Sequence, residues 1–140
     1  MPESDRPRPW PVLGAVAVGG IIGAESRFGL QWLFPHPAGG FAWATFAINI
    51  TGCLLLGAVM VLVIEVWPDR PLLRPFLGTG VLGGFTTFSS YTVEVQQAVA
   101  AGHPATAAAY LVGTLIVGLL AVWAGSGITT TLVRGTGARR

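Results

Sequence analysis

The sequence predicts an all-α membrane protein with four transmembrane helices, and its composition and segmentation both indicate this class. Of its 140 residues, 52% are hydrophobic and only 10% are charged, whereas a soluble domain usually has about 25% charged residues. A run of about 20 mostly apolar residues crosses the hydrocarbon core of a bilayer, and the chain contains four runs of this kind. A chain of this length is expected to form one domain.

The four expected spans follow one another with short connections rich in proline and glycine. Their approximate limits are residues 12–34, 41–64, 72–101 and 105–133. Tryptophan residues lie near several span ends, as an interfacial aromatic belt predicts. Because the connections are short, consecutive helices are expected to be antiparallel neighbours, without room for a catalytic domain outside the membrane.

These limits divide the chain into three parts. Residues 12–133 form the expected four-helix transmembrane domain. Residues 1–11 are polar and contain four prolines, so we expect a disordered N-terminal tail. Residues 134–140 are expected to form a basic C-terminal tail.

The arginine residues predict the orientation in the membrane. Four crossings put both termini and the loop at 68–75 on one side, and that side carries seven arginines: Arg6, Arg8, Arg70, Arg74, Arg134, Arg139 and Arg140. The two loops on the other side contain no Lys or Arg. The positive-inside rule therefore predicts cytoplasmic termini and one orientation in the cell membrane. The arginines form no stripe, so nucleic acid is not expected as a partner.

The third span has a composition that a simple lipid-facing helix would not have. It contains four glycines within seven residues, followed by five hydroxyl residues within six: Gly78, Gly80, Gly83, Gly84, then Thr86, Thr87, Ser89, Ser90 and Tyr91. Each glycine costs about 1 kcal/mol of helix propensity. A helix broken near mid-membrane explains them, but its freed carbonyls then need a cation, water or another helix as partner. Broken helices of this kind build ion sites at the bilayer midplane.

Polar residues in the other spans fall at helical spacing. Thr45 and Asn49 share one face of the second span, and Tyr110 and Thr114 share one face of the fourth. Glu94 extends the third span beyond the hydroxyl run. Two interpretations stay open: a narrow polar track between the helices, or hydrogen bonding between helices that only holds the packing together.

The first span contains two charges, and intramembrane charge indicates function by default. Glu25 and Arg27 are two residues apart, so they point to different helix faces and do not simply pair. Arg27 is expected to be a structural charge, which either snorkels to the interface or caps carbonyls of another helix. The first span also carries Gly19 and Gly23, a spacing that favours close helix packing, as do Gly52 with Gly57 and Ala109 with Gly113.

Three motifs occur in order along the first three spans. They are GGIIGAESRF at 19–28, NITG at 49–52 and GGFTTFSSY at 83–91. Together they resemble the motifs of the fluoride channels called Fluc or CrcB, whose third-helix signature usually reads GG-x-TTFSTF. The resemblance covers residues 12–125.

This resemblance implies an architecture. In that family two four-helix subunits pack antiparallel in a dual-topology-type dimer, one inverted in the membrane, and two pores run along the dimer. A buried Na⁺ at the dimer centre is structural and not transported. By motif position, the backbone carbonyls of Gly83 and Thr86 would hold it.

The resemblance also implies a fluoride pathway along Asn49, Phe88 and Tyr91. Candidate lining or vestibule residues are Thr45, Ser90, Tyr110, Thr114 and Glu94. Fluoride is strongly hydrated, so amide and hydroxyl hydrogens and the positive edges of aromatic rings must replace its water. Tyr91 stands where the family usually has Phe, which adds a hydroxyl donor and bulk.

The implied function is passive, fluoride-selective export from the cytoplasm of a microbial cell, with membrane lipid and an inverted second subunit as partners. The uneven arginine count favours an oppositely oriented paralogue as that subunit, while a homodimer that tolerates the bias is the alternative. A proton-coupled small multidrug transporter is a rival function, because Glu25 lies in the first span. A membrane assembly subunit is a second rival. An enzyme is not expected, since the sequence shows neither a nucleophile–base pair nor a metal-ligand cluster.

Overall fold

The computed structural model describes residues 9–37 and 39–137, and all regular structure within these residues is helical. In chain order the elements are α1 (Trp10–Leu33), α2 (Trp43–Val61), η2 (Leu62–Val66), η3 (Arg74–Leu82), α3 (Gly83–Phe85), α4 (Ser89–Ala100) and α5 (Pro104–Gly137). The π-helical stretch η2 continues α2, and the π-helical stretch η3 runs directly into α3. The expected all-α class is confirmed for the described residues.

Three helices are long and apolar enough to cross a membrane. They are Trp10–Leu33, Trp43–Val66 and Pro104–Gly135. Large apolar side chains on these helices are exposed, for example Trp32 and Trp123. A bilayer solvates such surfaces, so the chain is a multi-pass membrane protein. The third expected span, residues 72–101, is divided among η3, α3 and α4.

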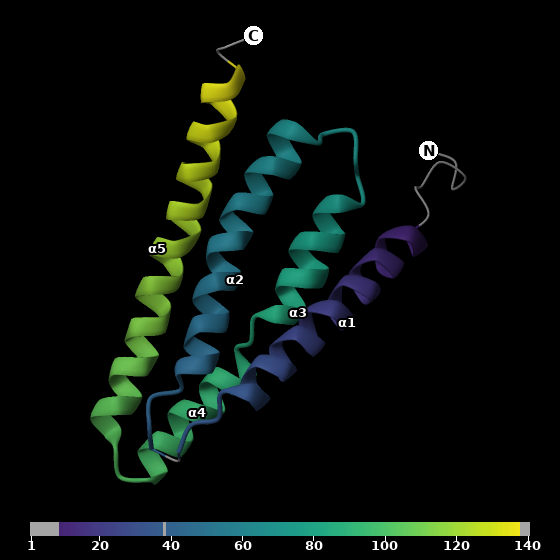
Figure 1. Cartoon of the computed structure of the whole chain (residues 1–140). Helices are drawn as coiled ribbons and strands as arrows, with labels where there is room; N and C mark the ends of the chain where they lie inside the picture. Colours follow the sequence, from purple (N-terminus) through teal and green to yellow (C-terminus); the bar gives the residue numbers. More distant parts are fainter. Residues whose placement is uncertain (1–8, 38, 138–140) are drawn as a thin grey trace, which may run out of the picture.

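The bundle contains two main helix packings. Helix α5 packs along α2, whereas α1 packs along η3 and α3, and α4 lies against α5. Figure 1 shows that α1 begins, α5 ends and η2 turns into η3 at the same end of the bundle. The α1–α2 loop and the α4–α5 turn lie at the opposite end. This arrangement agrees with the expected alternation of helix direction.

Glycines bring α1 against the third expected span. A Cβ atom added to Gly23 would overlap the carbonyl oxygen of Val81 and the backbone nitrogen of Phe85. A Cβ added to Gly84 would overlap the carbonyl oxygen of Gly20 in the same way. The backbones of α1, η3 and α3 can therefore approach this closely only because these positions lack a side chain.

The glycine spacings on the other helices had mixed outcomes. Gly57 of α2 lies against the Val122 carbonyl of α5, and Gly125 lies against the Leu54 carbonyl. By contrast, a Cβ on Gly113 would meet nothing within 4 Å. Within the chain, the close approach expected at Ala109 and Gly113 is therefore wrong, because α5 turns its other face, with Gly125, toward α2.

Both terminal helices are longer than expected. Helix α1 begins at Trp10, inside the expected tail 1–11, because Pro11 fits the first turn of a helix. Helix α5 continues past 133 to Gly137, and Arg134 in its last turn lies 3.5 Å from Glu65. A basic residue there also suits the negative end of the helix dipole. The remaining parts of the expected tails, 1–8 and 138–140, lie outside the described residues.

The packing of α1 gives a first prediction. Replacing Gly23 with Ala forces a methyl group into the Val81 backbone, and overpacking of this kind usually costs about 1–3 kcal/mol. The thermal unfolding midpoint of the purified protein in detergent should therefore fall. Gly14→Ala is the matched control on the same helix, because nothing lies within 4 Å of its Cβ position. Equal midpoints for the two variants would contradict the packing.

Candidate functional site

No regular helix is formed at residues 86–88, which we call the interruption. Helix α3 ends at Phe85, Thr86 is extended with φ −76° and ψ 155°, and α4 begins at Ser89. The backbone N–H and the hydroxyl of Thr86 both donate to the Leu82 carbonyl oxygen, at 3.0 Å each. Thr86 therefore closes α3, and the chain then turns into α4.

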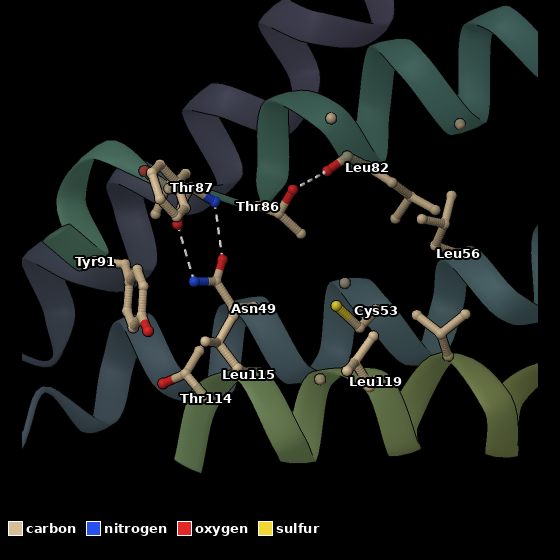
Figure 2. Close-up of a pocket in the computed structure, with 16 residues that line it drawn as sticks. Asn49, Cys53, Leu56, Leu82, Thr86, Thr87, Tyr91, Thr114, Leu115 and Leu119 are labelled. Atoms are coloured by element: carbon tan, nitrogen blue, oxygen red, sulfur yellow. Dashed lines mark hydrogen bonds between the residues drawn. The ribbon is translucent and has the colours of Figure 1, made fainter. Parts of the chain in front are cut away.

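Asn49 of α2 holds the interruption through its side-chain amide. Its Nδ2 donates to the Thr87 carbonyl oxygen at 2.9 Å, and its Oδ1 accepts the Thr87 backbone N–H at 2.8 Å (Figure 2). Both residues are only 9% exposed. One amide thus satisfies both backbone groups of one residue where no helix does.

The hydroxyl of Thr87 contacts the first turn of α4. Thr87 Oγ1 accepts the backbone N–H of Ser90 at 3.1 Å and donates to Ser90 Oγ at 3.2 Å. Hydroxyl groups commonly cap the free N–H groups in the first turn of a helix. The Thr87 side chain therefore ties the interruption to the helix that follows it.

Arg27 of α1 reaches the same region from the other side. Its Nε donates to the Gly84 carbonyl oxygen of α3 at 3.1 Å. The sequence left two arrangements open for Arg27, snorkelling to the interface or capping carbonyls of another helix. This contact is the second of them. The charge is thereby given a polar partner within the bundle, as intramembrane charges require.

A cavity of about 350 Å³ lies beside the interruption, between α2, η3 and α5 (Figure 2). Its wall includes six of the residues expected from the sequence: Asn49, Gly83, Thr86, Phe88, Tyr91 and Thr114. Thr114 is 7% exposed, and its hydroxyl has no hydrogen-bond partner among the described residues. This buried hydroxyl is therefore available to hydrogen-bond a molecule or ion in the cavity.

Aromatic rings line up along the same side. The ring centroids of Phe88 and Tyr91 are 5.8 Å apart, and those of Tyr91 and Tyr110 are 5.3 Å apart with an edge-to-face angle of 60°. Phe88 is 73% exposed, whereas Tyr91 is buried. The Tyr91 hydroxyl donates to the Leu111 carbonyl oxygen of α5 at 2.6 Å. Within the chain, the α5 backbone therefore occupies the hydroxyl donor that Tyr91 adds.

A second cavity, of about 440 Å³, lies toward the α1–α2 loop. Its polar wall includes Gln31, Thr45, Ser89, Ser90, Glu94 and Gln97. Thr45 Oγ1 and Tyr110 Oη each donate to one carboxylate oxygen of Glu94 at 2.6 Å. Gln31 Nε2 in turn donates to Thr45 Oγ1 at 3.0 Å. This network fixes the Glu94 carboxylate at the cavity wall.

Comparison with known proteins places the chain in a family. A family model described as "CrcB-like protein, Camphor Resistance (CrcB)" matches residues 14–126. The chain belongs to the CrcB-like family. The resemblance found in its three motifs is thereby confirmed.

Several relatives in this family carry the name "Fluoride-specific ion channel". FluC 2 of Streptomyces avermitilis is 54% identical over 105 residues, which are 75% of this chain and 66% of that protein. FluC 1 of Streptomyces coelicolor is 50% identical over 113 residues, or 81% of this chain and 73% of the relative. FluC 2 of Thermobifida fusca is 48% identical over 125 residues, or 89% and 92%. The chain thus spans just under two thirds of the first relative and nearly all of the third.

The expected site residues of this CrcB-family chain fall into two groups. Asn49 and Thr114 line the first cavity, whereas Thr45 lines the second, although Asn49 and Thr45 share a face of α2. Tyr110 lines neither of these cavities and instead holds Glu94. The Thr87–Ser90 hydrogen bond connects the two groups, since Thr87 lines the first cavity and Ser90 the second.

The sequence prediction missed two members of this site. Thr87 carries most of the polar contacts of the interruption, and Gln31 orients Thr45. The hydroxyl run of the third span and a polar side chain one turn after Arg27 were the available signals. Neither signal identifies the hydrogen-bond partner, because that depends on which helices pack together.

Two of the buried threonines of this CrcB-family chain, Thr45 and Thr114, give a second prediction. Thr45→Val removes a bond to a carboxylate and the bond from Gln31, and hydrogen bonds to charged groups contribute about 1.5–3 kcal/mol. Thr114→Val removes no hydrogen bond within the described residues and should leave stability unchanged or slightly higher. The thermal unfolding midpoint in detergent measures the stability of both variants. A larger fall of this midpoint for Thr114→Val than for Thr45→Val would contradict the hydrogen bonds assigned to the two threonines.

Proposed function

We propose that this chain is a subunit of a passive, fluoride-selective channel in the cell membrane. One observation carries the proposal: a cavity lined by hydroxyl, amide and aromatic groups lies at the interruption of the helix, and a second polar cavity is lined by Ser89 and Ser90, which follow the interruption directly. Membership of the CrcB-like family and the names of its relatives support it. The protein supplies a path for an ion and performs no covalent chemistry, so we propose no enzyme activity.

The proposed path replaces the water around fluoride with weak donors. Asn49 Nδ2 has two N–H groups, and only one is needed for the Thr87 carbonyl. The second N–H, the unpaired Thr114 hydroxyl and the positive edge of the Phe88 ring can face an anion in the first cavity. Thr45, Ser90 and Glu94 would shape the vestibule. Donors without a strong fixed positive charge let the ion enter and also leave.

We propose that a structural sodium ion accompanies this path without being transported. The carbonyls of Gly83 and Thr86 would hold it. The residues fit such an ion, because Thr86 lies where the backbone leaves α3, Gly83 lies three residues before it, and both line the first cavity. Unwound carbonyl groups of this kind coordinate Na⁺ in other membrane proteins. Bound there, the cation would supply positive charge to the oxygens that hydrocarbon leaves without partners.

The proposed assembly is an antiparallel dimer of four-span subunits. In it η3, α3 and α4 together form the third span, broken at residues 86–88. A second, inverted subunit would cover Phe88, whose ring is 73% exposed in the isolated chain. Arg70 lies in the connection from η2 to η3, Arg74 begins η3, and Arg134 lies in the last turn of α5. The turn from η2 to η3 and the end of α5 lie at the end of the bundle where α1 begins (Figure 1). One-sided charge of this kind favours an oppositely oriented paralogue over a second copy.

The proposed direction of transport is out of the cytoplasm, where both termini would lie. Hydrogen fluoride enters a cell as a neutral weak acid and dissociates inside. A membrane potential that is negative inside moves each anion outward with about 2.3 kcal/mol per 100 mV. A channel of this kind needs neither ATP nor a proton gradient.

The proposed contribution of the Phe88 ring to fluoride efflux gives a third prediction. Phe88→Ile removes the ring edge, so fluoride efflux from liposomes should be abolished while the protein still folds and inserts. Phe28→Ile is the matched control, because Phe28 is similarly exposed, at 66%, on α1. Unchanged efflux through a folded Phe88→Ile protein would remove Phe88 from the path.

The rival proton-coupled transporter gives a fourth prediction. Glu25 is exposed on α1, and a proton-coupled exporter that used it would lose activity on Glu25→Gln. The fluoride channel should keep most of its efflux in this variant. Loss of efflux in a folded Glu25→Gln protein would favour the rival function.

The assembly is tested by reconstitution. The chain is placed in liposomes alone and together with an oppositely biased paralogue, and fluoride efflux is recorded with an ion-selective electrode. An obligate heterodimer predicts efflux only from the mixture. Efflux from the chain alone would favour the homodimer.

A further inference from the structure

Two carbonyls at the end of α3 have lost the donors that a continuous helix would give them. In an α-helix each carbonyl accepts the N–H four residues later. For Gly83 that donor is the Thr87 N–H, which goes to Asn49 Oδ1 at 2.8 Å. For Thr86 it is the Ser90 N–H, which goes to Thr87 Oγ1 at 3.1 Å. In both cases a side-chain oxygen takes the donor away from the backbone.

The neighbouring carbonyls are treated differently. The Leu82 carbonyl accepts both the N–H and the hydroxyl of Thr86, and the Gly84 carbonyl accepts Arg27 Nε. The loss of the helical donors of Gly83 and Thr86 has an identified cause at each position. It follows from two particular side-chain oxygens, those of Asn49 and Thr87.

Two hydrogen bonds between Asn49 and Thr87 hold the Thr87 N–H away from the Gly83 carbonyl. The same amide that accepts the Thr87 N–H also donates to the Thr87 carbonyl, so the peptide groups on both sides of Thr87 are fixed in direction. Asn49 and Thr87 are each 9% exposed, which leaves little water to compete for these bonds. Buried polar groups keep such partners because a buried donor or acceptor without a hydrogen bond would destabilise the folded state.

We propose that Asn49 and Thr87 are positioning residues for a cation held by the Gly83 and Thr86 carbonyls. Their side-chain oxygens take up the competing N–H donors and so keep both carbonyls available as ligands. This inference rests on the sodium ion of the proposed function, and it assigns to Asn49 a task in addition to lining the fluoride path. Without these two oxygens the backbone would satisfy its own carbonyls, and the cation would lose ligands.

Thr87 offers the sharper test, because Val has the same shape without the acceptor. In Thr87→Val the Ser90 N–H is free to return to the Thr86 carbonyl, so sodium should bind at least about tenfold more weakly, as expected when a ligand oxygen becomes occupied. Thr87→Ser keeps the hydroxyl and should bind sodium like the original protein. Thr92→Val is a control on α4, since among the described residues its hydroxyl bonds the Phe88 and Ser89 carbonyls, away from Gly83 and Thr86.

The experiment measures the thermal unfolding temperature of the purified full-length protein, with its partner where one is needed, across a sodium chloride series. N-methyl-D-glucamine chloride keeps the ionic strength constant. A ligand that binds only the folded state raises this temperature according to its affinity. The sodium concentration that gives half of the rise should increase at least about tenfold for Thr87→Val and for Asn49→Ala. It should change less than twofold for Thr87→Ser and Thr92→Val.

The outcomes separate this inference from the function on which it rests. A Thr87→Val protein with the original sodium response overturns the positioning role while leaving the sodium ion in place. If sodium does not raise the unfolding temperature of the unsubstituted protein, the cation site itself is overturned. Fluoride efflux then tests the channel function separately. If Asn49→Ala does not fold, the comparison of Thr87→Val with Thr87→Ser still decides the question.

Discussion

The structure depends on one constraint: inside a bilayer, every backbone N–H and carbonyl group needs a partner from the protein or from something that the protein binds. A helix meets this requirement by itself, whereas the interruption at residues 86–88 cannot. Asn49 therefore supplies both bonds of Thr87, Thr87 supplies a bond to Ser90, and Arg27 supplies one to Gly84. Asn49 of α2 and Arg27 of α1 thus supply the polar partners that this part of the backbone needs.

The glycines make these contacts possible. Arg27 can reach the Gly84 carbonyl only because α1 lies directly against η3 and α3. That approach in turn requires the absence of a side chain at Gly23 and Gly84, where any Cβ would enter the opposite backbone. The glycines that weaken the third span as a helix thus also bring a charged partner to it. Close packing and an interrupted helix are two results of the same residues.

The second cavity is organised by a different balance. Glu94 carries a carboxylate within the bundle, and the hydroxyls of Thr45 and Tyr110 each donate to one of its oxygens. Paired hydrogen bonds of this kind offset part of the cost of placing a charge away from bulk water. They also hold the carboxylate at the wall of the cavity instead of across it. The vestibule of the proposed path is therefore shaped by residues that need not touch the ion.

The sequence alone determined the class, three apolar helices long enough to cross a membrane and the anomaly of the third expected span, because hydrophobicity and helix propensity are local properties. It also identified the family through three motifs, and it named six residues of the first cavity through that resemblance and through helical spacing. Only the tertiary structure decided which groups bond: that Asn49 binds the backbone of Thr87, that Gln31 supports Thr45, and that Tyr91 donates to Leu111. It also showed that α2 meets Gly125 and not Gly113. Spacing along a helix fixes a shared face, whereas a partner depends on the rotation and depth at which another helix packs against it.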